Sequence, residues 1–152
     1  MESGIFFATG VSIVLHPYNP MVPIIHMNIR YFEMEDGTHW FGGGIDLTPH
    51  YIVPEDAAYF HGRLKETCDI FDSNYYPKFK NWADDYFFIK HRQETRGIGG
   101  IFYDRLSASS DTHFQGILDF SLALGRLFPE VYTYFMKKNS GLPFGPEQKA
   151  WQ

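Results

Sequence analysis

The sequence predicts an α+β protein, in which a mostly antiparallel β-sheet has helices packed on both faces. Segments with the composition of strands come early in the chain, and segments with the apolar spacing of helices follow in runs, an order typical of α+β folds. The chain has 152 residues, and 18% of them are aromatic. A chain of this size buries one substantial core, so residues 1–152 are expected to form a single domain.

The composition argues against several classes of protein. The formal net charge is −5 and the lysines and arginines form no block, which disfavours a nucleic-acid partner. Cys68 is the only cysteine, so an intramolecular disulfide and a CxxC metal motif are excluded. No apolar run reaches transmembrane length, and the N-terminal residues lack the basic and apolar regions of a signal peptide. The expected location is therefore the cytoplasm.

Two strands are predicted first, and both carry polar residues. Residues 10–16 (GVSIVLH) and 24–33 (IIHMNIRYFE) are short and rich in β-branched residues. Because side chains alternate along a strand, the second segment has an apolar face and a polar face. The polar face carries His26, Asn28 and Arg30, and Ser12 and His16 share one face of the first segment. If the two strands pair, these polar residues form one surface.

A third strand is expected over residues 38–42, ended by three glycines in the motif HWFGGGIDLTPHY. Glycines persist where the backbone turns sharply or approaches another group closely. One interpretation is a tight turn, with Asp46 stabilising it through its side chain. The other is a backbone floor against a flat ligand, with the Asp46 carboxylate directed at that ligand.

Helices are predicted over the later segments. Residues 53–71 have Pro54 and acidic residues in the first turn, and the i, i+3, i+4 spacing places His61 on the apolar face. Residues 75–96 form a second, aromatic-rich helix in this interpretation. The remaining expected elements are a strand at 97–104, a helix from about 109 to 127, and a further helix at 129–138.

Histidines and arginines are the main candidates for chemistry. None of the seven histidines lies in an HExxH motif or a His-x-His pair, so the spacing gives no strong metal signal. Arg30, Arg92 and Arg96 are candidates for holding carboxylates, because the guanidinium fork fits that group; the alternative is ordinary solvated arginine. From the residues alone, the prediction stops at an α+β protein that binds a flat anionic ligand.

Longer motifs carry the prediction further. The segments GVSIVLHPYNPMVPIIHMNIRYFE, WFGGGIDLTP, YYPKFKNWADDYFFIKHRQETRGIGGIFYD and FGPEQKAWQ closely resemble the oxygen-dependent coproporphyrinogen III oxidases of haem biosynthesis. The resemblance implies an oxidoreductase that converts two propionates of coproporphyrinogen III to vinyl groups, giving protoporphyrinogen IX. Dioxygen is then the oxidant, and carbon dioxide and hydrogen peroxide are released. It implies a homodimer and no required organic cofactor; a divalent metal is proposed for some members.

The resemblance also assigns roles to residues of this chain. His26 matches the proton donor, and Asp46 matches an aspartate that meets the pyrrole N–H groups. The substrate contacts it implies are Ser12, Asn28, Ile29, Arg30, Arg92 and Arg96. The metal ligands it implies are His16, His26, His61 and His91.

Family members extend beyond this chain at both ends, and a GRYVEFN…DRGT segment follows the matched region in them. The chain therefore resembles a central part of the family fold, without the N- and C-terminal segments, and little oxidase activity is expected from it alone. Two alternatives to the enzyme remain open at this point. One is a truncated, non-catalytic chain that binds a tetrapyrrole or self-associates, and the other is a metal-binding protein that uses the four histidines.

Overall fold

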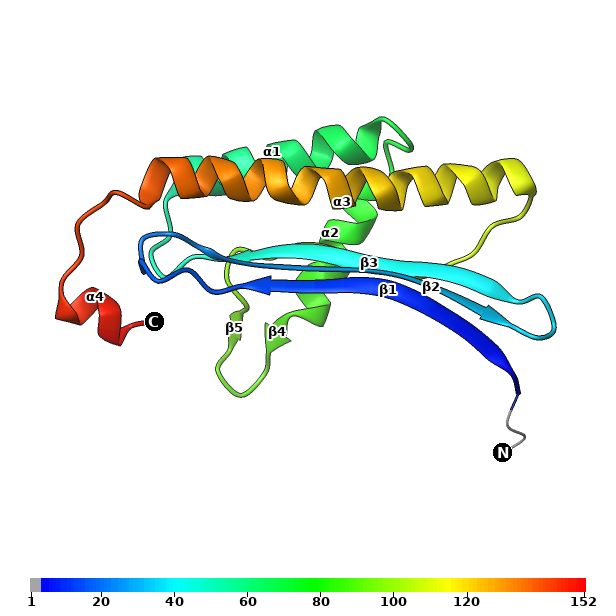
Figure 1. Ribbon diagram of the computed structural model, residues 1–152, viewed down its shortest axis with the longest axis horizontal. Coiled ribbons are helices and arrows are strands. Elements are labelled where there is room, and N and C mark those ends of the chain that lie inside the picture. The colour runs from blue at the N-terminus through cyan, green and yellow to red at the C-terminus, as the bar shows by residue number, and fades with distance from the viewer. Residues whose placement is uncertain (1–3) are drawn as a thin grey trace.

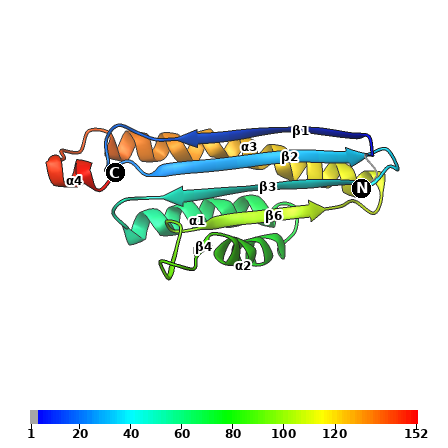
Figure 2. The same ribbon diagram turned by 90° about the horizontal axis from the view of Figure 1, so that it is seen from below.

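A four-stranded antiparallel sheet forms the centre of the protein. The computed structural model describes residues 4–152, and its strand order is β1-β2-β3-β6. The sheet strands are β1 (Phe6–Leu15), β2 (Ile24–Met34), β3 (His39–Thr48) and β6 (Gly100–Leu106). The helices α1 (Pro54–Asp69) and α3 (Asp111–Asn139) lie side by side over one face of this sheet (Figures 1 and 2). The α+β class and the antiparallel sheet predicted from the sequence are thus confirmed.

Period-two alternation decides which residues of the sheet are buried. The side chains of Ile25 and Met27 on β2 and of Ile45 and Leu47 on β3 point toward the helices and are at most 6% exposed. The helices contribute the other half of this core, chiefly through Phe60, Leu64, Phe120, Leu124, Val131 and Phe135. Burial of such side chains contributes roughly 1.5–3 kcal/mol each, so the helices cover this face of β2 and leave open the face with the polar centre, His26, Asn28 and Arg30.

Strand β3 does not end at the glycines but runs through them to Thr48, which corrects the predicted end at residue 42. A strand tolerates glycines where neighbouring groups need the space of a side chain. At Gly43, an added Cβ would lie 2.7 Å from the Asn28 carbonyl oxygen and 2.8 Å from the Tyr103 hydroxyl. That hydroxyl pairs with Ser121 Oγ at 3.0 Å, and burial raises the pKa of Tyr103 to about 12.

The helix α2 (Tyr75–Tyr86) ends ten residues before the predicted end at residue 96. The chain then forms a small hairpin of β4 (Phe88–Ile89) and β5 (Glu94–Thr95), closed by a hydrogen bond from the Arg96 amide to the Phe87 carbonyl at 3.0 Å. Gln93 in its turn has a φ of 54°, a conformation outside the helical region. The aromatic residues support a helix as far as the end of α2. The helix cannot continue to residue 96, because the chain has to turn back there to begin strand β6.

The helix α3 is a single helix of 29 residues that contains Pro129, so the two helices predicted at 109–127 and 129–138 are one. A proline inside a helix costs about 3 kcal/mol because it removes a hydrogen bond and clashes with the preceding turn. Buried side chains on both sides of Pro129, such as Leu124 and Phe135, pack on the same core. This continuous apolar face offsets the cost. A short helix, α4 (Pro146–Ala150), follows and was not predicted.

Helices were expected on both faces of the sheet, and the two faces differ in this respect. The helices α1 and α3 cover one face, while α2 passes the β6 edge and the β4–β5 hairpin projects on the opposite side (Figures 1 and 2). Phe79 of α2 packs in the core, 5.2 Å from Tyr103, whereas Tyr86 at its last turn stacks on Phe102 at 4.0 Å. Only the end of α2 therefore reaches the second face, which is called the open face below.

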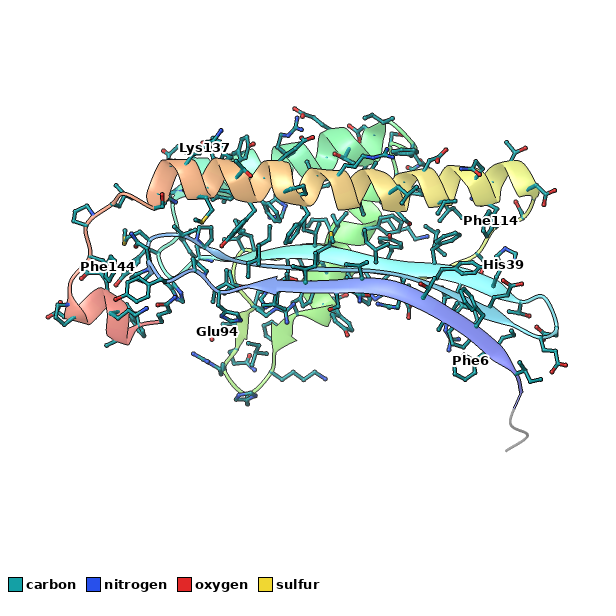
Figure 3. All side chains as sticks on the ribbon, in the orientation of Figure 1. Phe6, His39, Glu94, Phe114, Lys137 and Phe144 are labelled. Atoms are coloured by element: carbon teal, nitrogen blue, oxygen red, sulfur yellow. The ribbon has the colours of Figure 1, made fainter. Side chains whose placement is uncertain are left out.

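Side chains labelled in Figure 3 show the same division. Phe114 and His39 lie between the sheet and the start of α3, with ring centroids 5.3 Å apart. Phe6 lies on the open face, where its ring stacks on Phe32 at 5.1 Å. The open face is thus bounded by an aromatic group at one end and by the hairpin, with Glu94, at the other (Figure 3).

Gly43→Ala is expected to lower the free energy of unfolding by about 1–3 kcal/mol, because the added methyl group meets a backbone carbonyl in a packed sheet. Gly116→Ala is the matched control. This residue lies in α3 with nothing within 4 Å of the added Cβ, and alanine there should stabilise by about 0.5–1 kcal/mol. Urea denaturation of both variants measures the difference. Equal effects in the two would contradict the close approach at Gly43.

Candidate functional site

The open face gathers polar groups from all four strands in neighbouring rows. The first row has His26 opposite Asp46, and the second has Asn28 opposite Gly44. The third has Arg30 opposite Gly42. Strands β1 and β6 extend these rows with Ser12 beside Asn28 and with Phe102 beside Gly44. The polar surface predicted from pairing of the first two strands is therefore formed, and β3 and β6 enlarge it.

Asp46 is the most buried charged group on this face, at 2% exposure. Arg96 donates to it with two nitrogens: Nε lies 3.0 Å from Oδ2 and Nη2 lies 2.8 Å from Oδ1. This bidentate arrangement is the strong geometry for arginine and carboxylate. His26 Nδ1 lies 3.3 Å from Asp46 Oδ2, at ion-pair distance but outside hydrogen-bond geometry. Asp46 thus stabilises no turn; it joins two candidate site residues.

Arg30 lies at the other end of the face. Its Nη1 donates to Asn28 Oδ1 at 2.6 Å, and its Nη2 lies 3.0 Å from Asp104 Oδ1. Arg30 and Asp46 are four residues apart in register, which corresponds to roughly 13 Å along the strands. The open face therefore carries an arginine near each end, and each arginine is paired with a carboxylate.

Between the two arginines the face is hollowed and partly aromatic. A hollow of about 350 Å³ is lined by Ser12, His26, Asn28, Arg30, Gly44, Asp46, Tyr86, Phe87, Arg96 and Phe102, among others. Phe102 forms one wall, with Tyr86 stacked on it, and the Arg96 guanidinium lies 4.2 Å from the centre of the Phe87 ring. Cationic and aromatic groups around one hollow suit a flat ligand with negative substituents.

Several predicted residues contribute to this hollow less directly or not at all. Ile29 points toward the helices, because it has the opposite parity to Arg30 and packs against the core, so only its backbone is available to a ligand on the open face. Ser12 lines the hollow from β1. Arg92 pairs with Glu94 at 2.7 Å on the hairpin, with 64% of its side chain exposed. It lies outside the hollow.

The four histidines assigned to a metal are spread over both sides of the sheet. The rings of His16 and His26 are 6.3 Å apart. His61 lies on the helix side, where its ring nitrogens pair with the Ile98 carbonyl at 2.9 Å and with the Tyr76 hydroxyl at 3.0 Å. His91 is exposed in the hairpin. Within residues 4–152, no three His, Cys, Asp or Glu side chains are placed to hold one metal ion. These four residues do not fit a shared metal site.

Cys68 has no part in the open face. It is fully buried in α1 on the helix side, and burial raises the pKa of its thiol to about 12. Because the thiolate is the reactive form of cysteine, this residue is part of the core and not a nucleophile.

Asp104, Phe102, Tyr86 and Phe87 were not predicted as site residues. Asp104 and Phe102 could have been found from the sequence. Alternation along the segment GIFYD places both side chains on one face of the strand, and in the sheet this is the face on which Asp46 lies. Tyr86 and Phe87 could not, because they lie where α2 ends, at the turn into the hairpin.

These features define a class of protein: an α+β protein that gathers paired arginines and carboxylates, with a histidine, on one open sheet face, an arrangement that suits an anionic ligand. The family described as "Coproporphyrinogen III oxidase" matches residues 1–152. The chain belongs to this family, as the sequence motifs predicted.

Three similar proteins illustrate the relationship. A mitochondrial oxygen-dependent coproporphyrinogen-III oxidase of Homo sapiens is 50% identical over 97% of this chain and 33% of its own length. A chloroplastic one of Hordeum vulgare is 46% identical over 97% of this chain and 39% of its own. An oxygen-dependent coproporphyrinogen-III oxidase of Rickettsia bellii is 46% identical over 98% of this chain and 52% of its own length. The chain thus spans between a third and about half of the length of these relatives.

The names of these relatives correct one prediction. The expected cytoplasmic location is contradicted, because the plant relatives are named as chloroplastic and the human one as mitochondrial. The features behind that expectation, a single cysteine and the lack of a long apolar run, do not distinguish a cytosol from an organelle interior. Across residues 4–152, no helix has the length and apolar character that a membrane crossing requires.

Arg96→Gln is expected to lower the free energy of unfolding by about 1–3 kcal/mol, because it leaves the buried Asp46 carboxylate without its bidentate partner. Arg92→Gln is the matched control, since it removes the same charge from an exposed pair on the hairpin. That change should stay within about 0.5 kcal/mol. Chemical denaturation measures both, and a loss in Arg92→Gln as large as in Arg96→Gln would contradict the structural role of the Asp46–Arg96 pair.

Proposed function

We propose that the open face binds coproporphyrinogen III and that this protein converts two of its propionates to vinyl groups with dioxygen as oxidant. The observation that carries the proposal is the pair of arginines, Arg30 and Arg96, at the two ends of a polar, partly aromatic hollow. Coproporphyrinogen III is broad and anionic, with four propionates and four planar pyrrole rings joined by methylene groups, and these are the properties that this arrangement suits. The family supports the same substrate, since its relatives are named coproporphyrinogen-III oxidases.

Each residue of the hollow has a role in this proposal. Arg30 and Arg96 bind propionates through the N–H groups that their carboxylate partners leave free, because a guanidinium carries five N–H donors. His26 acts as the proton donor. Asp46 keeps a negative charge beneath the ligand, where it holds His26 and Arg96 and stabilises positive charge that develops on a pyrrole ring.

The reaction as proposed needs no organic cofactor. For each of the two propionates converted, one dioxygen accepts two electrons and two protons and leaves as hydrogen peroxide, while the carboxylate leaves as carbon dioxide. The histidines expected from the resemblance do not fit a shared ion, since His61 is on the far side of the sheet from His26. No step of the proposal is therefore assigned to a metal.

We also propose that the protein acts as a homodimer. Strand β1 is an edge strand of the sheet, and Phe6, Phe7 and Val11 on it are each more than half exposed. An exposed apolar edge favours association. Light scattering at increasing concentration should show a dimer, and a strict monomer throughout would contradict this proposal.

Two measurements test the activity. Titration with coproporphyrin III, the stable oxidised form of the substrate, should change its fluorescence as it binds this chain. Protoporphyrin fluorescence after incubation with coproporphyrinogen III should then be compared in air and without air. Product formed equally without air would contradict an oxygen-dependent reaction, and failure to bind coproporphyrin would contradict the proposed substrate. The expectation that this chain alone turns over little substrate is tested by the same assay.

Substitutions at Asp46 and Arg30 should affect different kinetic constants. Asp46→Asn keeps the shape but removes the charge, so kcat should fall by about 10²–10³. Arg30→Ala should mainly raise KM, because a propionate is held alike in the ground and transition states. Steady-state kinetics of the matching substitutions in a full-length relative measure both. If kcat stays within about threefold after Asp46→Asn, far from that loss, the catalytic role of Asp46 is wrong.

A further inference from the structure

We infer that Asp104 is a positioning residue: it holds the Arg30 guanidinium across strand β3, above Gly42, in the place where it receives an anionic group of the ligand. The inference rests on the proposed function, because it explains how one end of the same hollow is built.

The first observation is how far Arg30 reaches. Arg30 is on β2 and Asp104 is on β6, so β3 lies between them. Their side chains meet directly above Gly42: an added Cβ there would lie 2.7 Å from Arg30 Nε, 2.9 Å from its Cζ and 2.7 Å from Asp104 Oδ1. A side chain at position 42 would occupy the space of this ion pair. Gly42 therefore keeps a passage open across the strand.

The second observation is an irregularity in β6 at the same place. The register between β3 and β6 shifts between Phe41 and Gly43, so Asp104 and Arg105 both stand opposite Gly42. Arg105 has a φ of 49°, in the left-handed region that costs a non-glycine residue free energy. Bulges of this kind change the direction of side chains and are frequent beside active sites. Here the bulge interrupts the regular pairing at the residue that meets Arg30.

The third observation concerns the Asp104 carboxylate itself. Its Oδ1 atom is buried and makes no hydrogen bond with residues 4–152, although the residue as a whole is partly exposed. A buried carboxylate oxygen is costly unless an opposite charge compensates it. Arg30 Nη2, at 3.0 Å, supplies that charge. In return the carboxylate limits where the guanidinium can lie.

Arg30 is thus fixed from two sides and still has free donors. Asn28 Oδ1 accepts from Nη1, and Asp104 attracts Nη2. One of the five N–H groups of the guanidinium is then engaged in a hydrogen bond, to Asn28, and others remain for a ligand. The pair is about one-third exposed, unlike the buried Asp46, so water and ligand reach it. Holding a long side chain in its binding conformation removes an entropy cost from ligand binding.

A positioning role for Asp104 and a purely electrostatic role predict opposite changes in the affinity for an anionic ligand when the carboxylate is removed. If Asp104 were merely a negative charge near an anion site, its removal would tighten the binding of an anionic ligand. If it positions Arg30, its removal weakens binding although the site becomes more positive. Asp104→Asn should therefore raise the Kd for coproporphyrin III by about three- to fivefold, the range of a partly exposed ion pair. Asp104→Glu, which keeps the charge, should recover most of the affinity.

Gly42→Ala provides a second variant that alters no charge. The atoms that its methyl group meets are the ends of flexible side chains, so the fold should remain while Arg30 is displaced and the Kd rises at least as much. Asp119→Asn is the matched control: it makes the same charge change on an exposed residue of α3, where Asp119 accepts a hydrogen bond from Gln115 at 2.9 Å. The Kd of the Asp119→Asn variant for coproporphyrin III should equal that of the parent.

A measurement without ligand tests the positioning directly. The Nε–H signal of Arg30 in a nitrogen-15 NMR spectrum, assigned by its loss in Arg30→Lys, should show a restrained side chain in the parent and in Asp104→Glu. It should show a mobile one in Asp104→Asn. Equal mobility in all three, or an unchanged or lower Kd in Asp104→Asn, overturns the inference alone. A parent chain that does not bind coproporphyrin overturns the proposed function as well.

Discussion

Strand β3 carries no side chain at three consecutive positions, and three separate contacts use the space that this leaves. Above Gly42, on the open face, Arg30 meets Asp104. Beneath Gly43, on the helix side, the Tyr103 hydroxyl reaches Ser121. An added Cβ at Gly44 would meet the Ile101 carbonyl oxygen at 2.7 Å. The close approach of β6 to β3 thus depends on these glycines, and both the core and the site are built on it.

The same strand connects the core to the chemistry. Two residues beyond Gly44, Asp46 is held between His26 of β2 and Arg96, which follows the hairpin. Because the strand is fixed by its close packing on β6, the carboxylate is fixed too. A site built on strands holds its groups more accurately than a site built on loops. Arg92, by contrast, lies on the hairpin, where it pairs with Glu94 and does not line the hollow.

The two arginines differ in how firmly they are held, and this difference suits two tasks. The pair of Arg96 with Asp46 is bidentate and its carboxylate is buried. The pair of Arg30 with Asp104 makes a single contact and is about one-third exposed. The first arrangement fixes charge near His26, where proton transfer is proposed. The second leaves a donor-rich group at the far end of the hollow, where binding is proposed.

The sequence by itself determined the family, the α+β class and the polar face of β2, because alternation along a strand and long ordered motifs are local properties of the chain. It placed His26, Asn28 and Arg30 on one face, and the structure has them there. It failed where packing outweighs local preference: β3 runs through its glycines, and α3 runs through Pro129. In both cases the contacts that decide lie far away in sequence.

Only the tertiary structure decided which charged groups meet. Asp46 and Arg96 are 50 residues apart in sequence, and Arg30 finds Asp104 across a strand that separates them. The tertiary structure also places His61 on the helix side, where the Tyr76 hydroxyl and the Ile98 carbonyl pair with its ring nitrogens, although the family resemblance grouped it with His26 as a metal ligand. Sequence spacing fixes the direction of a side chain within one element. Its partner depends on the register and order of the strands, which long-range packing sets.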